Sequence, residues 1–312
     1  MHYYLGIDGG GTKTTCAVGD DSRLLVTVAA GPSNIVRVGE TLARESLHQA
    51  VRQACADAGI TPGQVARTCV GGSGAARSEL AESVRRILAE VLSTPIDVVG
   101  DMEIALEAAF DTGPGVIVIA GTGSIAYGRN REGMIARAGG WGFAIGDEGS
   151  AHWIGCQALS AVLRASDQAT ANPQTHVALE GSAFAAALMK AWGVTSLIDL
   201  ARAANSIPTP DFAALFPAIA ASHDALALHV LSNAGMELAG VAAVVIHRLF
   251  AGGEIKVVPV AMIGGVFRHA DHVRKVFYNE LRRIEPRVEI SLQVVEPVEG
   301  ALRLARRSTI TK

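Results

Sequence analysis

Closely spaced cysteines are missing from this sequence. The four cysteines, Cys16, Cys55, Cys69 and Cys156, lie far apart, and no two of them form a C-x-x-C pair. Zinc knuckles and thioredoxin-like redox sites use such pairs, and secreted disulfide frameworks use more regular cysteine spacing. The spacing therefore argues against all three kinds of protein.

Charge of one sign and membrane-directed segments are missing as well. The 27 Lys and Arg against 30 Asp and Glu give a net charge of −3, and the basic residues form no stripe of the kind nucleic-acid binders show. The N-terminus lacks the basic and apolar segments of a signal peptide. The longest apolar run, residues 234–250, contains Glu237, His247 and Arg248, which favours a core helix over a membrane span. We expect a cytoplasmic protein that binds neither nucleic acid nor membrane.

Glycine is abundant, and its distribution is informative. The chain has 312 residues, of which 49% are hydrophobic, so it is long enough for two folded domains and is not a largely disordered protein. Glycine accounts for 34 of them, more than the usual ~7%. The glycines occur in clusters, which predicts places where the backbone approaches a ligand or another segment closely.

Strand and helix patterns alternate along the first third of the chain. Strands are predicted at 3–8, 14–19, 24–29, 65–70 and 96–99, helices at 40–58 and 78–92, and a glycine turn at 71–74. This alternation predicts an α/β fold. About 110 residues after the start, the opening arrangement recurs, with strands at 116–120, 125–129 and 134–137 around a glycine turn. The recurrence predicts a duplicated, two-domain architecture whose glycine turns face each other. Residues 149–250 read as mostly helical with a break near 205–210, and strands at 257–263 and 290–295 and a helix at 300–307 follow.

The first glycine turn has the chemistry of a phosphate site. Gly10 and Gly11 let backbone N–H groups converge on an anion, and Thr12 and Lys13 add a hydroxyl and an ammonium group. Asp8, at the end of a buried strand, suits a hydrated Mg²⁺. The segment is not a Walker A loop, because the G-x-x-x-x-G-K-[ST] pattern and its following helix are missing. The alternatives are a plain hairpin turn with a surface Asp and, for Lys13, a side chain that faces only solvent.

Two further glycine segments extend this pattern. Gly121, Thr122 and Gly123 form the second turn, and Gly264 and Gly265 follow a predicted strand. Each is a weak signal alone, since an ordinary hairpin explains the turn equally well. Together, two strand-borne turns predict a clamp around the phosphates of a nucleotide, with the Gly264–Gly265 backbone against a flat adenine.

These motifs resemble those of a known superfamily. Residues 8–14, 121–124 and 264–265 are similar to the two phosphate motifs and the adenosine motif of the actin-like ATPase fold, which sugar kinases, actin and heat-shock chaperones share. The segment GGWGFAIGDEGSAHWIG at 139–155 resembles the signature of the N-acetylglucosamine kinases in the BadF/BadG/BcrA/BcrD ATPase family. The likeness covers nearly the whole chain. It implies an α/β fold of duplicated ribonuclease H-like domains, with two lobes around a cleft for nucleotide and sugar.

The resemblance also implies roles for individual residues. It makes Asp101 the base that takes the proton from the 6-hydroxyl of the sugar; its alternative is a helix N-cap. It assigns sugar contacts to Asn34, Asp101, Ser124, Gly140, Trp141 and Asp147. It assigns nucleotide contacts to Gly10, Gly11, Thr12, Lys13, Gly121, Thr122, Gly123, Ala213, Gly264 and Gly265, and Mg²⁺ through water to Asp8.

Several of these residues have plainer alternatives. Asn34 also reads as a turn residue after a proline, and Asp147 as an acid at the start of a helix. Trp141 also reads as a core aromatic, like Phe143. Ile125 departs from the family, where Asn can follow this Ser, and its apolar side chain removes one polar contact that would help to select the sugar.

The expected activity is ATP- and Mg²⁺-dependent phosphorylation of N-acetylglucosamine at its 6-hydroxyl, in a homodimer. We expect one lobe to consist of residues 1–112 together with the terminal helix at 298–312, and the other lobe to consist of residues 113–297. Sugar binding is expected to close one lobe on the other. Glucosamine is the nearest alternative substrate. An ATPase that activates a 2-hydroxyacyl-CoA dehydratase-type partner would need cysteines placed to share an iron–sulfur cluster, which the spacing does not offer. A non-catalytic sugar sensor would be expected to lack the base, and Asp101 is present.

Overall fold

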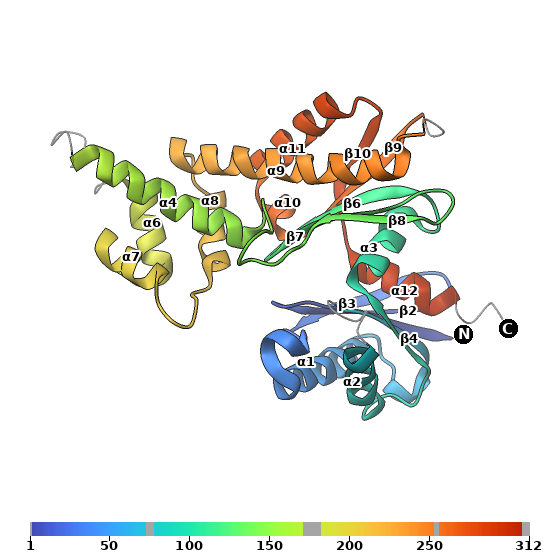
Figure 1. Ribbon diagram of the computed structural model, residues 1–312. Coiled ribbons are helices and arrows are strands. Elements are labelled where there is room, and N and C mark those ends of the chain that lie inside the picture. Colours follow the sequence, from blue (N-terminus) through green and yellow to red (C-terminus); the bar gives the residue numbers. More distant parts are fainter. Residues whose placement is uncertain (1, 73–77, 171–181, 253–255, 308–312) are drawn as a thin grey trace. The chain divides into compact units, whose positions relative to one another are not determined.

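The computed structural model describes residues 2–72, 78–170, 182–252 and 256–307 (Figure 1). The chain forms two compact units. Unit 1 combines Met1–Pro114 with Val295–Lys312, and unit 2 is Gly115–Val294.

Unit 1 is built on a mixed sheet of five strands among the described residues, in the order β3-β2-β1-β4-β5. β1 runs antiparallel to β2, β2 antiparallel to β3, and β4 and β5 continue in parallel with β1. The carboxyl ends of β1, β4 and β5 therefore lie along one edge of the sheet. The strands are β1 (Tyr3–Gly9), β2 (Thr14–Gly19), β3 (Leu24–Ala30), β4 (Val65–Gly72) and β5 (Ile96–Gly100).

Helices cover both faces of this sheet (Figure 1). Apolar residues of α1 (Ile35–Asp57) and α2 (Ser78–Ala89) form a core with one face, and α3 (Asp101–Phe110) and α12 (Pro297–Arg307) form a second core with the other face. The backbone of α12 approaches Gly6 of β1 so closely that a Cβ there would lie 2.7 Å from the carbonyl oxygen of Val298. The short helix η1 (Pro62–Gln64) leads into β4.

Unit 2 repeats the topology of unit 1. Its sheet has the order β10-β9-β6-β7-β8, with β6–β7 and β7–β8 antiparallel and β6–β9 parallel. The turn between β6 and β7 thus occupies the position that the turn between β1 and β2 occupies in unit 1. This equivalence confirms the duplicated α/β fold predicted from the sequence. The strands are β6 (Gly115–Ala120), β7 (Ser124–Arg129), β8 (Ile135–Gly139), β9 (Val258–Ile263) and β10 (Val288–Val295).

Helix α9 (Ala225–Phe250) organises the core of unit 2. It lies along the sheet and packs on β6, β7 and β8 on one side and on α11 (Asp271–Ile284) on the other (Figure 1). It is long and apolar enough to cross a membrane, but 56% of its most apolar window is buried within the protein. The remaining elements are α4 (Ala151–Thr170), α6 (Ala183–Trp192), α7 (Leu197–Ala204), η2 (Phe212–Leu215), α8 (Phe216–Ala220) and α10 (Gly265–His269).

Some predicted boundaries were wrong. The helix predicted at 40–58 begins at Ile35, with a break at Gly39, whose φ is 79°. Gly71 and Gly72, expected in a turn, belong to β4 and pair with Asp8 and Gly9, because strand β4 continues as far as its neighbour β1. The rest of that predicted turn, at 73–74, and the predicted helix beyond Arg307 lie outside the described residues.

Candidate functional site

The turn at residues 10–13, hereafter the first glycine turn, is tied to the start of α1. The N–H of Gly10 donates to the carbonyl of Lys13 at 3.0 Å, which closes the turn. The carbonyl of Gly10 accepts hydrogen bonds from the N–H groups of Ser33, at 3.1 Å, and Asn34, at 3.3 Å. The structure therefore brings Asn34 beside the turn. Thr12 and Lys13 have exposed side chains.

Asp8 and Asp101 belong to the same edge of the unit 1 sheet. Asp8 lies near the end of β1, and Asp101 directly follows β5. Burial is the main cause that raises the pKa of Asp8 to about 6, and the carboxylates of Asp101 and Glu296 raise it further, while Lys13 opposes the shift. Negative charge is thus crowded where the first glycine turn begins.

This arrangement fits a hydrated cation. A divalent ion would relieve the repulsion that disfavours the Asp8 carboxylate. Within the described residues, no three His, Cys, Asp or Glu side chains form a metal-binding cluster. Mg²⁺ commonly takes one or two carboxylates and fills its other positions with water and substrate phosphates. Asp8 suits that mode of binding.

Asp101 is the first residue of α3. Gly100 is the N-cap, and its N–H donates to Glu103 Oε1 at 3.1 Å, so the capping role considered for Asp101 belongs to these neighbours. Asp101 Oδ1 accepts a hydrogen bond from the N–H of Met102 at 3.0 Å. The carboxylate is thus held at the start of a helix, where the helix dipole favours negative charge.

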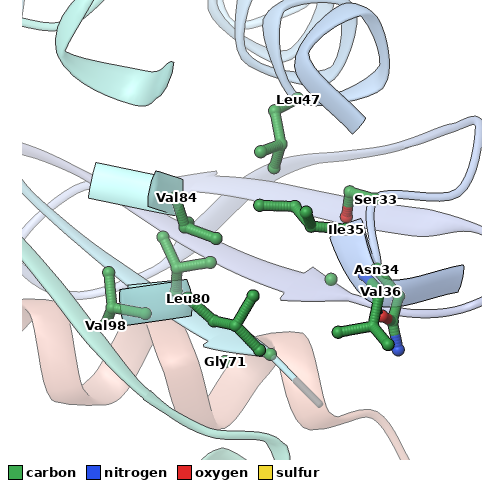
Figure 2. A pocket seen from close by; sticks show the side chains of 12 residues that line it. Ser33, Asn34, Ile35, Val36, Leu47, Gly71, Leu80, Val84 and Val98 are labelled. Carbon is green, nitrogen blue, oxygen red and sulfur yellow. Dashed lines mark hydrogen bonds between the residues drawn. The ribbon is translucent and has the colours of Figure 1, made fainter. Parts of the chain in front are cut away.

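Asn34 is the N-cap of α1. Its Oδ1 accepts hydrogen bonds from the N–H groups of Val36, at 3.1 Å, and Arg37, at 3.3 Å. Beside it lies a pocket of about 30 Å³, whose walls are mainly aliphatic (Figure 2). The pocket is lined by Gly9, Ser33, Asn34, Ile35, Val36, Leu47, Val70, Gly71, Gly72, Leu80, Val84 and Val98.

The second glycine turn, residues 121–123, is fixed by the start of α4. The carbonyls of Gly121 and Thr122 accept hydrogen bonds from the N–H groups of Ala151, at 2.8 Å, and His152, at 3.4 Å. Gly264 packs against the end of β6, and a Cβ there would overlap the carbonyl oxygen of Ala120. Its φ of 102° is also in the region that favours glycine. The structure therefore brings Gly264 to the second turn.

Asp147 lies directly against this turn. A Cβ built at Gly123 would lie 2.7 Å from Asp147 Oδ2, so an added side chain there would displace the carboxylate. Asp147 Oδ1 accepts a hydrogen bond from the N–H of Gly142 at 3.0 Å. Burial is the main cause that raises the pKa of Asp147 above its ordinary value. Ser124 donates from its hydroxyl to the carbonyl of Glu148 at 2.7 Å, which joins the turn to the same loop.

The loop at residues 139–149, which we call the signature loop, exposes aromatic side chains. Trp141 is 66% and Phe143 58% exposed, so neither is a core aromatic. The guanidinium of Arg137 lies 5.1 Å from the Trp141 ring centroid. Ile125 fills the space beside Gly140, where an added Cβ would lie 2.7 Å from its Cδ1. The residue that departs from the family pattern thus packs on one of the predicted sugar contacts.

The last two predicted nucleotide contacts lie on helices. Ala213 lies in η2, and its N–H donates to Asp211 Oδ1 at 3.1 Å. The ring of Phe212, one residue before it, lies 5.2 Å from that of His152 at the start of α4. Gly265 begins α10, directly after Gly264.

Each unit thus gathers its own share of the predicted residues. Unit 1 joins the first glycine turn to Asn34 and places Asp8 within electrostatic reach of Asp101. Unit 2 joins the second turn to Gly264, Asp147 and the signature loop. Arg37 is one residue that the sequence analysis missed, and the structure puts it over Gly11. Its position three residues after Asn34, in the same segment that follows the turn, was the sequence feature that could have pointed to it.

The fold and these turns define a class: duplicated α/β proteins with a glycine turn in each half. Residues 5–305 match the BadF/BadG/BcrA/BcrD ATPase family, and the chain belongs to that family.

Curated relatives agree with this membership, and a solved structure shares the fold. The chain is 41% identical over 172 residues to an N-acetylmuramic acid/N-acetylglucosamine kinase of Clostridium acetobutylicum. The matched segment covers 54% of this chain and 56% of the relative. The chain is 36% identical over 176 residues to an N-acetyl-D-glucosamine kinase of Dictyostelium discoideum, which covers 53% and 55%. The chain therefore spans about half the length of the curated relatives it matches. A crystal structure from Chromobacterium violaceum, described as a candidate N-acetylglucosamine kinase, superposes with a TM-score of 0.72 over 98% of this chain and 99% of that one, at 24% identity. This last likeness shows the fold alone.

Proposed function

We propose that this protein transfers the terminal phosphoryl group of ATP to the 6-hydroxyl of an amino sugar, most simply N-acetylglucosamine. The observation that carries the proposal is the pair of acids in unit 1, Asp8 and Asp101, beside a glycine turn. The sugar kinases named among the relatives support the same reading. The cytoplasm is the compartment we propose, and a homodimer is the proposed assembly.

In this proposal, Asp101 is the general base. Its carboxylate accepts the proton of the sugar 6-hydroxyl as the hydroxyl oxygen forms a bond to the terminal phosphorus. The bond from that phosphorus to the bridging oxygen breaks, and ADP leaves with the electron pair. Asp8 would hold a hydrated Mg²⁺, which would neutralise charge on the phosphates. The glycine turns supply backbone N–H groups to the phosphates.

Unit 2 supplies the remaining polar contacts of the proposal. The Asp147 carboxylate has one oxygen held by the Gly142 N–H and would accept hydrogen bonds from ring hydroxyls of the sugar. Trp141 offers an exposed apolar face of the kind that sugar rings stack on. Gly264 and Gly265 would take the adenosine.

A coupled ADP-release assay tests the proposal. Glucose, glucosamine, N-acetylglucosamine, N-acetylmannosamine and N-acetylmuramic acid are compared as acceptors, with Mg²⁺ and with excess chelator. We expect N-acetylglucosamine to be the preferred acceptor, phosphorus NMR to place the phosphate on its 6-oxygen, and chelator to abolish turnover. A protein that phosphorylates none of these sugars would overturn the proposal.

The dehydratase-activator alternative receives no support from the thiols. Cys16, Cys55 and Cys69 are buried, and Cys156 is half-buried. Burial raises the pKa of Cys69 to about 12 and that of Cys156 to about 11. Thiols in these surroundings are poor candidates for ligands shared with a partner subunit. An iron–sulfur chromophore in protein purified without oxygen would revive this alternative.

A further inference from the structure

Arg37 places a cation over the first glycine turn. It lies in the first turn of α1, where Asn34 caps its backbone N–H. A Cβ built at Gly11 would lie 3.2 Å from Cδ and 3.3 Å from Nη1 of Arg37. The side chain therefore lies across the glycine, and a Cβ at Gly11 would crowd it.

Arg44 and Arg67 of unit 1 are engaged by acids, and Arg37 is not. Arg44, on the same helix, pairs with Glu40 at 2.6 Å. Arg67 makes two hydrogen bonds to Asp97, at 2.7 Å and 3.0 Å. Across the residues that the structure describes, no ion pair joins Arg37 to a carboxylate, and its side chain is exposed.

We propose that Arg37 binds the phosphate chain of the nucleotide at the first glycine turn. The proposal rests on the nucleotide part of the proposed function. A guanidinium presents a planar fork of N–H donors that matches a pair of phosphate oxygens, whereas the Lys13 ammonium acts as a point charge. Arg37 therefore adds directional hydrogen bonds to a turn whose backbone donors alone are not selective for the number of phosphates.

Calorimetric titration of Arg37→Gln with Mg·ATP, Mg·ADP and adenosine tests this role. Charge-assisted hydrogen bonds to phosphate are among the stronger ones, so we expect Mg·ATP affinity to fall about 10-fold and adenosine affinity to stay unchanged. Arg37→Lys is expected to recover part of the loss, because it restores the charge without the fork. Arg52→Gln is the matched control, since Arg52 is an exposed arginine farther along the same helix.

Several outcomes overturn the inference. Equal Mg·ATP affinity in Arg37→Gln and wild type would do so, and so would an equal loss for adenosine or a loss confined to sugar binding. A wild-type protein that binds no nucleotide would overturn both proposals. A wild type that binds Mg·ATP but phosphorylates none of the sugars would overturn the proposed kinase activity alone, because the binding comparison between variants still measures the contribution of Arg37.

Discussion

Asp8 carries a charge in surroundings that disfavour it. Burial and the neighbouring Asp101 carboxylate raise its pKa to about 6, so at neutral pH the ionised form costs stability in the nucleotide-free protein. We expect Asp8→Asn to be more stable than wild type at pH 7.5 in excess chelator, while the proposed kinase activity is lost. Urea unfolding of both proteins measures the first effect and the ADP-release assay the second.

The pH dependence of this difference follows from the direction of the shift. A carboxyl group whose pKa is raised in the folded protein contributes stability to the folded state. That contribution is fully present below the unfolded-state pKa of ~3.9 and is lost as pH rises through the folded-state pKa. The advantage of Asp8→Asn is therefore expected to be complete above about pH 6 and to vanish toward pH 4. An Asn variant that is the less stable protein at pH 7.5 would contradict the raised pKa.

Asp101 is the residue on which the proposed chemistry depends. Asp101→Asn should lower kcat by about 10²–10⁴, the range for loss of a general base. The fold should persist, because an Asn side chain keeps the oxygen that accepts the Met102 N–H. Steady-state kinetics and a thermal melt measured together check both statements. Turnover within threefold of wild type would remove Asp101 from the role of base.

At the scale of elements, the second glycine turn packs directly against Asp147 of the signature loop. Gly123→Ala would place a methyl group 2.7 Å from Asp147 Oδ2 and push the carboxylate away from the Gly142 N–H. We expect the amino-sugar KM to rise about 10-fold, as for loss of a charge-assisted hydrogen bond. Gly121→Ala is the control for thermal stability, since a Cβ there meets no atom within 4 Å. Unchanged sugar affinity in Gly123→Ala would separate Asp147 from sugar binding.

Sequence reasoning located elements better than contacts. Strand β2 lies at the residues that the sequence pattern predicted. The repeated strand–glycine turn–strand unit predicted the duplication that appears as two sheets with equivalent strand order. The break at Gly39 was not predicted, because the apolar spacing begins only after it. The exposure of Trp141 was also beyond reach, since its surroundings depend on a loop held by glycines with positive φ. The position of Arg37 over Gly11 comes from a tertiary contact that no local pattern encodes.

At the scale of the whole molecule, unit 1 is assembled from both ends of the chain. Leu302 of α12 is 2% exposed and belongs to a core cluster with Tyr4 and Ile104. Leu302→Ala should destabilise unit 1 by about 2–5 kcal/mol, the usual cost of such a cavity. Because Trp141, Trp153 and Trp192 all belong to unit 2, tryptophan fluorescence reports the unfolding of that unit.

Two probes distinguish local from global effects of this variant. If the units unfold separately, Leu302→Ala shifts the urea transition followed by circular dichroism and leaves the fluorescence transition in place. Glu299→Gln on the same helix is the control, since its 3.9 Å pair with Arg303 is exposed and contributes little. Coincident shifts of both transitions would show that the two units unfold as one.

The place of α12 also sets an order of events during synthesis. Unit 2 is one continuous stretch, Gly115–Val294, and is complete before α12 is translated. The sheet of unit 1 emerges from the ribosome first, but the face that α12 covers stays open until α12 has been translated. The apolar surface of this N-terminal part thus stays exposed while the 180 residues of Gly115–Val294 are added. Chaperones that bind emerging chains should therefore associate with residues of β1 and α3 longer than with any segment of unit 2.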